Sequence, residues 1–312
     1  MSNYKEIYAL TGQPEYDVGF WNYMKGIESA ENKLQAGRNR STGTYSMPVT
    51  SSKKYEDNIC AESVLRNIAT VFTNYTSGSR IWAADSDDIA EFVGEFESIP
   101  VNDVKNDFTK ISVDSNKLAV LFRVPDEFAR DSAFIFENYL LKRLSKCFAK
   151  AEDKAFILGS GIKEPVGIIH ESEGAEIGTT TDRLTYDDVI KLYFSIKPEY
   201  RKNGVWLMND ETAQTLRTIK DNSGNYLWRN TDDAILGKRV IISEYMPNAE
   251  NESKPIAFGD FSYYWIIKRS QVTVKVLREL FSENGQLGYL AFEFIDGKLV
   301  RKDAVKVLKI AK

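Results

Sequence analysis

The pattern of apolar positions is clearest between residues 126 and 158, where they recur at steps of three and four. These positions are Phe128, Ile135, Tyr139, Leu140, Leu144, Cys147, Phe148, Ala151, Ala155 and Leu158. Such a period is typical of a helix with one apolar side. Pro125 with two acids behind it favours a helix start, and Gly159 favours a helix end. The pattern predicts one helix over residues 126–158, about 50 Å long at 1.5 Å per residue, with Cys147 on its buried side.

Apolar periodicity also divides the rest of the chain. A shorter helical pattern in residues 61–73 places Val64, Leu65, Ile68, Val71 and Phe72 on one side. Later, helices and strands alternate: a helix capped by Thr185, the strand "VWLMN", a helix beginning near Asp210, and the strands "GKRVIISEYMP" and "KPIAFGD". This alternation predicts an α/β lobe over residues 184–268. Three strand-like runs follow, "QVTVKVLREL", "GQLGYLAFEFIDGK" and "DAVKVLKIAK", and we expect them to return the chain to the first lobe.

Two segments have a pattern that gives them no obvious core within the chain. Residues 1–57 begin with an aromatic stretch whose helix would need a partner surface for Phe20, Trp21 and Tyr23. The polar part after it, rich in Gly, Ser and Thr, is typical of an extended arm. In residues 79–109, strand-like sequences enclose a run with many acids and a single base. The acids are Asp85, Asp87, Asp88, Glu91, Glu95, Glu97, Asp103 and Asp107, and the base is Lys105. This pattern predicts a long hairpin with an acidic tip that packs on another molecule.

Composition restricts the class of protein. The chain has 312 residues, is 43% hydrophobic and 28% charged, and has a mean hydropathy of −0.36, as a soluble globular protein would. Its 41 basic and 45 acidic side chains nearly cancel, so composition gives no reason for tight nucleic-acid binding over the whole surface. With only Cys60 and Cys147, we expect no disulfide framework. There is no apolar run long enough to span a membrane and no apolar signal-peptide core, so we expect a cytosolic product.

Candidate chemistry is sparse. The "GSG" of residues 159–161 partly matches a phosphate-binding loop, but such a loop precedes a helix N-terminus, and here it follows a helix. We interpret it as a joint. His170 is the only histidine, so Ser/His/Asp or Cys/His catalysis would need it; we interpret it as the end of a strand. One histidine and two separated cysteines make zinc improbable, and "DSDDIAEF" lacks the glycine of a calcium loop. The acids of residues 85–107 are more typical of a solvated face than of a glycosidase pair. We predict no catalytic, cofactor-binding or metal-binding residue and no cofactor.

Several stretches together resemble the major capsid proteins of tailed bacteriophages and prophages with the Hong Kong 97 fold. "AEDKAFILGSGIKEPVGII" resembles the helix-to-loop signature of that family, and "VPDEFARDSAFIFENYLLKRLSKCFAKAEDKAF" resembles its long spine helix. "WLMNDETAQTLRTIKDNSGNYLW", "LGKRVIISEYMP" and "IAFGDFSYYWIIKR" are similar to its axial domain and the return from it. The acidic run around "AEFVGEFESIP" lies where the family has an extended loop. The resemblance covers the chain from about Tyr45 onward, in the family's order.

The resemblance implies an α+β fold with a peripheral domain (a long spine helix and a β-sheet), an axial α/β domain, an extended β-hairpin loop and an N-terminal arm. The boundaries would be 1–57 for the arm, 58–78 and 110–183 for the peripheral domain, 79–109 for the hairpin, 184–268 for the axial domain and 269–312 for the peripheral C-terminal strands. The tip of the axial domain, residues 220–230, would point at a fivefold or sixfold axis, and the aromatic arm and the hairpin would lie on other subunits.

The implied function is a non-enzymatic structural one. Hexamers and pentamers of this chain would form an icosahedral shell around double-stranded phage DNA, assembled in the bacterial host cytoplasm and located in the virion. The implied partners are further copies of the chain, a separate scaffolding protein, a portal, in some systems a cement protein, and packaged DNA touched without sequence preference; no membrane is implied.

Two departures from the family and two alternatives belong beside this interpretation. Many relatives begin with a cleaved scaffolding segment, whereas here Met1 stands almost at the arm. The lysine–asparagine crosslink of the founding member, with its nearby glutamate, is not expected, because Gly288 and Ile295 align near the asparagine and glutamate. The first alternative is an encapsulin-type nanocompartment shell of the same fold. The second is a carboxylate-dependent hydrolase that uses the acids of residues 85–107.

Overall fold

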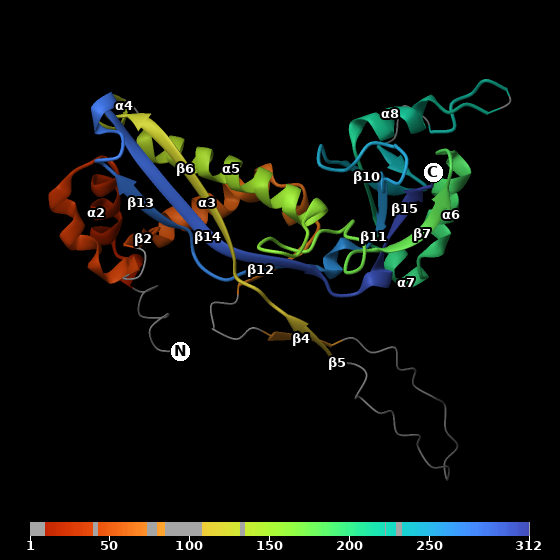
Figure 1. The fold of residues 1–312 in the computed structure, drawn as a ribbon, viewed down its shortest axis with the longest axis horizontal. Coiled ribbons are helices and arrows are strands. Elements are labelled where there is room, and N and C mark those ends of the chain that lie inside the picture. Colours follow the sequence, from red (N-terminus) through yellow and green to blue (C-terminus); the bar gives the residue numbers. More distant parts are fainter. Residues whose placement is uncertain are drawn as a thin grey trace, which may run out of the picture.

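A computed structural model describes residues 10–39, 43–73, 80–84, 108–131, 135–221, 223–228 and 233–311. Within these residues the chain forms two larger sheets at opposite ends of an elongated molecule, with a two-stranded ribbon projecting between them (Figure 1). The strand order is β1-β2-β13-β14-β12-β3 in the first sheet, with β6 also paired to β14, and β7-β15-β11-β8-β10-β9 in the second. Mixed helix and sheet agree with the α+β class predicted from sequence.

The first sheet is built around β14 (Gln286–Leu299), a 14-residue strand that pairs with three others. β6 (Asn116–Pro125) lies antiparallel along most of its length, from Gln286↔Pro125 to Ile295↔Asn116. The other strands of this sheet are β1 (Arg38–Asn39), β2 (Thr44–Ser46), β3 (Thr70–Thr73), β12 (Tyr264–Lys268) and β13 (Thr273–Leu277). The long apolar pattern of β14 is therefore explained by burial, because this strand is the centre of the sheet.

Two helices, α3 (Val49–Glu62) and α5 (Phe136–Leu158), pack against each other and against this sheet. The buried side of α5 carries Phe136, Leu140, Leu144, Phe148 and Phe156, as its three- and four-residue spacing predicted. Phe136 lies against Tyr289 of β14, with ring centroids 5.5 Å apart. The core of this half therefore lies between the α3–α5 pair and the sheet.

The predicted single helix over residues 126–158 is wrong at its start. A five-residue helix, α4 (Asp126–Arg130), is followed by non-helical Asp131 and Ile135, and α5 begins at Phe136. The physical reason is that Phe128 and Ile135, which extended the apolar pattern, are 52% and 65% exposed, so the buried side of α5 does not continue through them. The backbone N–H of Asp126 donates to Gly285 O, so α4 is held at the end of β14 instead.

Gly159 ends α5, as predicted, and it does so for a steric reason. A Cβ atom at this position would lie 2.1 Å from Pro165 O and 2.4 Å from Ala155 O. The loop therefore folds directly back onto the helix end, where Gly167 N–H donates to Gly159 O at 2.9 Å. The "GSG" sequence is a joint, and no helix begins there.

The second sheet has a mixed topology and its own core. Its strands are β7 (Glu176–Thr181), β8 (Val205–Met208), β9 (Ala234–Ile235), β10 (Lys238–Ile242), β11 (Ile256–Gly259) and β15 (Val305–Ile310). The helices α6 (Tyr186–Ser195), α7 (Pro198–Arg201) and α8 (Asp210–Thr218) belong to the same half. Trp206 and Phe258 stack at 4.1 Å in the centre of its core. The predicted cap is present: the Thr185 side chain accepts from Asp188 N–H and begins α6.

The expected return of residues 269–312 to the first half is wrong for the last strand. β15 lies in the second sheet, antiparallel to β11 and parallel to β7. Conversely β12, which the predicted boundary at residue 268 assigned to the α/β lobe, lies in the first sheet beside β14. Both strands are almost wholly buried, and apolar pattern alone does not indicate which of two sheets will cover a strand. In the described part the chain thus crosses between the halves three times: after α5, after β11 and after β14.

Only the base of the predicted hairpin is described. β4 (Arg80–Ala84) pairs antiparallel with β5 (Phe108–Ser112), from Arg80↔Ser112 to Ala84↔Phe108. This pairing agrees with the strand-like flanks of the predicted hairpin, and the two strands form a ribbon that projects away from both sheets (Figure 1). The acidic tip, residues 85–107, lies outside the described residues.

The N-terminal aromatic helix is buried within its own chain, contrary to the expectation that another subunit would cover it. α2 (Pro14–Met24) packs beside the 3₁₀ segment η1 (Glu28–Gly37). Phe20, Trp21 and Tyr23 are 0%, 9% and 6% exposed. The Tyr289 hydroxyl of β14 donates to Met24 O at 2.7 Å, so the helix is attached to the central strand of the sheet.

Three further expectations need correction. Residues 49–57 belong to α3 and not to an extended arm. The helix predicted over residues 61–73 is absent: α3 ends at Glu62, a short 3₁₀ turn η2 (Leu65–Asn67) follows, and β3 occupies Thr70–Thr73. The reason is that Trp265↔Thr70 and its neighbours pair β3 with β12, and this pairing outweighs the local helical pattern. Cys147 is exposed on α5 because its position is one residue off the buried side.

In the described residues no helix has the length and apolar character needed to cross a membrane.

Candidate functional site: a buried ion network

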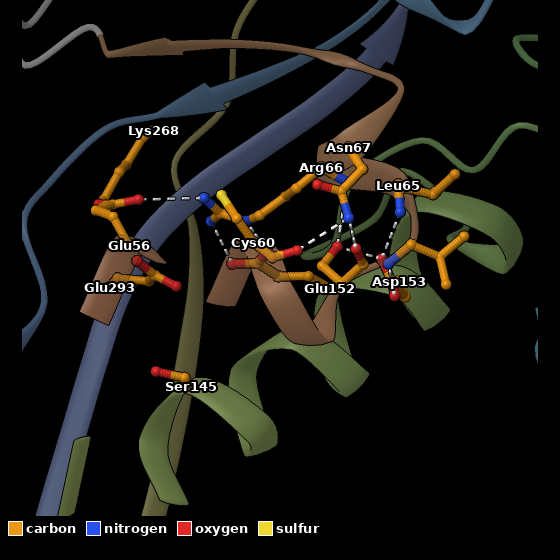
Figure 2. Close-up of polar contacts among 12 residues, drawn as sticks. Glu56, Cys60, Leu65, Arg66, Asn67, Ser145, Glu152, Asp153, Lys268 and Glu293 are labelled. Carbon is orange, nitrogen blue, oxygen red and sulfur yellow. Dashed lines mark hydrogen bonds and ion pairs between the residues drawn. The ribbon is translucent and has the colours of Figure 1, made fainter. Parts of the chain in front are cut away.

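Charged side chains meet in the core where α3, η2, α5, β12 and β14 come together (Figure 2). The network consists of Glu56, Arg66, Glu152, Lys268 and Glu293. Burying charge is costly unless it is paired and hydrogen-bonded, so such a group of side chains needs an explanation.

Arg66 and Glu152 form the centre of the network. Arg66 Nε donates to Glu152 Oε2 at 2.6 Å, and Nη2 donates to Oε1 at 2.8 Å. The two side chains are 1% and 0% exposed. This two-pronged geometry matches a planar guanidinium to a carboxylate, and it is the strongest form of ion pair in proteins. It joins η2 to the middle of the buried side of α5.

Glu56 of α3 and Lys268 of β12 extend the network toward the surface. Glu56 Oε2 lies 3.4 Å from Arg66 Nη1, and Lys268 Nζ donates to Glu56 Oε1. Lys268 is 5% exposed whereas Glu56 is 37% exposed, so Glu56 is the member that reaches solvent. The chain of contacts therefore links the first sheet to both helices that cover it.

Glu293 enters from the central strand β14. Its Oε1 accepts from the Tyr55 hydroxyl at 3.3 Å, and its Oε2 has no hydrogen-bond partner among the described residues. The side chain is completely buried. A buried carboxylate oxygen without a hydrogen-bond partner is unfavourable. A proton shared among the carboxyl groups of the network would reduce this cost.

The balance of charges within the network explains why it needs such a proton. Three carboxyl groups face two cations, and burial raises the pKa of Glu152 to about 8, with Arg66 opposing this rise and Glu293 adding to it. Burial lowers the pKa of Lys268, and the charge of Glu293 opposes that fall. Burial alone would lower the pKa of Arg66, but the pairing with Glu152 outweighs it and raises that pKa. The network is close to electrical balance when one proton is shared among its three carboxyl groups, while the two-pronged contact with Arg66 favours the ionised form of Glu152.

Asp153, next to Glu152 on α5, fixes the turn that carries Arg66. Its Oδ1 accepts from Ser63 Oγ at 2.7 Å and Leu65 N–H at 3.2 Å, and its Oδ2 accepts from Val64 N–H at 2.8 Å. Burial raises the pKa of Asp153, and these hydrogen bonds oppose the rise. The carboxylate thus satisfies the backbone donors at the start of η2 and orients Arg66 toward Glu152.

The sequence contained a signal for this network that the sequence analysis missed. Glu152 lies four residues from both Phe148 and Phe156, on the side of the helix whose other members are mostly apolar. Glu293 interrupts the continuous apolar run "LAFEFI" of the central strand. A charged residue at an apolar position of a regular pattern indicates a buried partner, so Glu152 and Glu293 together could have predicted the network.

The Arg66–Glu152 centre of the network is closed to solvent, whereas Glu56 and Lys268 line a groove of about 420 Å³. A groove of about 480 Å³ lies between α5, β6 and the loop after Gly159, and Glu152 contributes to its wall. The side chain of Glu152 is nevertheless 0% exposed, so its carboxylate is not presented to the groove. No cluster of three or more His, Cys, Asp or Glu side chains suited to a metal ion occurs in the described part of the chain. The network is therefore suited to holding elements together.

His170, the one histidine, has a local structural role. Its Nδ1 accepts from the backbone N–H groups of Glu173 at 3.1 Å and Ser172 at 3.4 Å. The ring therefore fixes a turn between α5 and β7, and the expectation that His170 ends a strand is wrong, because no strand precedes it in this described stretch. The acids of residues 85–107, the other candidate site weighed from the sequence, lie outside the described residues.

The far end of the second half carries an exposed loop between α8 and β9. Asp221 Oδ1 accepts from the backbone of Ser223 and Asn225, both at 2.8 Å, and Lys220 pairs with Tyr226 in an isolated bridge. Tyr226 and Leu227 are 47% and 40% exposed. Adjacent aromatic and aliphatic side chains exposed beside such a hydrogen-bonded turn are suited to a contact with another molecule.

Comparisons with solved structures identify the class of fold. The capsid of a native GTA particle computed with C5 symmetry matches at 28% identity and TM-score 0.64, covering 80% of this chain and 90% of that chain. The capsid of the empty GTA particle matches over the same shares at 27% identity and TM-score 0.68. A chain of Gordonia phage Cozz, at 13% identity and TM-score 0.57 over 80% and 87% of the two chains, shows the fold alone. No curated protein matches.

These likenesses define the class: a shell-forming capsid protein with the Hong Kong 97-type fold. The model of the phage capsid family matches residues 43–310, so the chain belongs to that family. It is a major capsid protein that forms an icosahedral shell, and its place is the virion. The two alternatives, a nanocompartment shell and a carboxylate-dependent hydrolase, are not favoured.

Proposed function

We propose that this chain assembles into pentamers and hexamers in which the tip of each axial domain points at the fivefold or sixfold axis. The resulting shell encloses double-stranded DNA. In this proposal the half built on β14, α3 and α5 is the peripheral domain, and the half built on β8, β11 and β15 is the axial domain. The chain acts without catalysis. Assembly takes place in the bacterial cytoplasm with a separate scaffolding protein and a portal, and with a cement protein where one is present.

The observation that carries this proposal is the shape of the subunit together with its likeness to a capsid computed with C5 symmetry. Two sheets lie end to end, so the molecule is elongated and offers long sides to neighbours (Figure 1). The ribbon β4–β5 projects from this body (Figure 1), which suits a segment that lies over an adjacent copy. Shells built from one chain require the same surfaces to pair around several axes.

The loop between α8 and β9 is the candidate for the contact at the axis. The described part of this loop projects at the end of the elongated molecule farthest from α2 (Figure 1), and its Tyr226 and Leu227 are exposed. Asp221 fixes the backbone at Ser223 and Asn225, which lowers the cost of ordering this turn when it meets identical turns.

The test is electron microscopy of the purified protein, with size-exclusion chromatography beside it. We expect closed polyhedral particles, or rings of five and six subunits. Tyr226→Ser with Leu227→Ser should give a folded subunit, by circular dichroism, that forms neither. Tyr226→Phe keeps the ring and is the matched control, which should assemble normally. A wild-type protein that stays a monomer at high concentration and with scaffold added would overturn the proposal.

A further inference from the structure

The exposed face of α5 carries a continuous row of positive charge. Lys142, Lys146, Lys150 and Lys154 are exposed and follow one another at four-residue steps, so they form a nearly straight line along the helix. At 1.5 Å per residue the row is about 18 Å long. Arg143 lies beside it, with its guanidinium over the Phe122 ring at 4.8 Å. We call these five residues the basic row.

No acid interrupts the basic row. The two acids in this part of the helix, Glu152 and Asp153, are turned inward to the buried network and its cap. Lys142, Lys146 and Lys150 form no ion pair with any described residue, while Lys154 lies close enough to Glu164 to help lower its pKa. Like charges four residues apart on a helix repel each other, so the row is unfavourable for the isolated subunit.

The row also contrasts with the charge of the whole chain. The net charge is −4, so cations confined to one helix face concentrate positive potential on a surface that is otherwise slightly acidic. The only other side chain exposed in the middle of this face is Cys147, and no exposed aromatic or methionine lies among the lysines.

This composition favours one kind of partner. Contact surfaces between proteins are poor in lysine at their centre and rich in aromatic anchors, whereas surfaces that bind DNA are strongly positive and polar. Over about 18 Å, duplex DNA presents about ten phosphates, one per 1.7 Å of axis. The opposite side of α5 is packed on α3 and the sheet, so the helix itself cannot enter a groove of DNA and only its exposed side chains can reach a partner. Such a surface binds backbone phosphates without reading bases.

We propose that the basic row of α5 is the surface on which this subunit contacts the phosphate backbone of packaged double-stranded DNA, so that α5 faces the interior of the shell. The inference rests on the proposed function, because it names the part of the subunit that touches the enclosed DNA.

The first test is DNA binding by the full-length subunit over a series of salt concentrations. The triple variant Lys142→Gln, Lys146→Gln and Lys150→Gln keeps side chains that favour helix and removes three charges. The slope of log K against log salt should decrease in magnitude by about 2.7, at about 0.9 for each phosphate that the variant no longer neutralises. The matched control removes the exposed Lys33, Lys53 and Lys202, also as Gln, and should keep the wild-type slope. An equal decrease in both variants, or none in the first, overturns the proposal.

Cys147 gives a second, local test because it lies within the row. In a Cys60→Ser background, maleimide labelling of Cys147 should slow several-fold when double-stranded DNA of arbitrary sequence is added, and recover in high salt. Polyglutamate at equal charge should protect less. If polyglutamate protects and DNA does not, the row binds an acidic protein segment and the proposal is wrong.

Shell assembly separates this inference from the function on which it rests. The triple variant should form particles of wild-type diameter that retain less DNA. Normal particles with normal DNA content would overturn the role of the row and leave the shell intact. A wild-type protein that forms no particles would remove the proposed function, while the salt slope and the labelling would still decide whether the row binds DNA.

Discussion

Replacing Arg66 by Met removes the cation at the centre of the buried network. The variant loses two charge-assisted hydrogen bonds, of 2.6 and 2.8 Å, and leaves Glu152 buried with no cation in contact. Breaking a buried pair by removing one partner costs about 3–5 kcal/mol. We expect a loss of this size in the free energy of unfolding. It should be larger at pH 8 than at pH 5, because Arg66 opposes the rise in the pKa of Glu152, and only toward the higher pH does Glu152 ionise beside it in the wild type.

The measurement is urea unfolding of the unassembled subunit, followed by tryptophan fluorescence and circular dichroism. Lys54→Met is the matched control: it breaks the Lys54–Glu137 pair, which has a similar distance of 2.7 Å but is 56% and 30% exposed. Exposed pairs contribute about 0–1 kcal/mol. Burial, and not the pairing distance, should therefore decide the size of the effect.

A double variant, Arg66→Met with Glu152→Met, completes the cycle. Because apolar side chains of similar volume replace buried ion pairs at little cost, it should recover most of the stability lost by Arg66→Met alone. The reasoning fails if Arg66→Met costs no more than Lys54→Met, or if the double variant loses the sum of its two single changes.

Three other changes test separate parts of the structure. Burial raises the folded-state pKa of Glu152 to about 8. Protonation of Glu152 therefore contributes stability that is complete below its usual pKa near 4.5 and is lost as the pH rises through about 8. Wild-type stability should therefore fall over this window, and Glu152→Gln should flatten the fall in pH-dependent urea unfolding. Gly159→Ala should lower the free energy of unfolding by about 1–3 kcal/mol or more, because its Cβ would meet Pro165 O; an unchanged urea midpoint would contradict the close approach. Phe20→Ala should cost about 3–5 kcal/mol in the isolated subunit, whereas Val18→Ala, 59% exposed, should be nearly neutral; equal, small effects would return α2 to the role of an arm that needs a neighbour.

Local patterns predicted those elements whose stability is local. The end of α5 at Gly159, the cap of α6 at Thr185 and the strand β8 follow from side chains within a few residues of each element. The base of the hairpin also followed from the two strand-like sequences on either side of the acids.

The errors arose where distant parts of the chain decide the outcome. Residues 70–73 form a strand because β12, nearly 200 residues later, supplies the hydrogen bonds. The rings of α2 are covered by a sheet whose central strand, β14, begins at Gln286. The buried network was missed for the same reason: Arg66, Glu152 and Glu293 come from three separate elements, and only their positions within apolar patterns indicated that they are inside.

The position of β15 in the second sheet has a consequence for the order in which the subunit is completed. This strand lies between β7 and β11, and it is synthesised after every other strand in the described part of the chain. Until residues 305–310 emerge from the ribosome, β7 and β11 each have an edge without its partner, and such edges invite pairing with other chains. The half that we place at the axis therefore cannot complete its sheet until the strands of the other half have been made, which favours lateral association only after both halves are present.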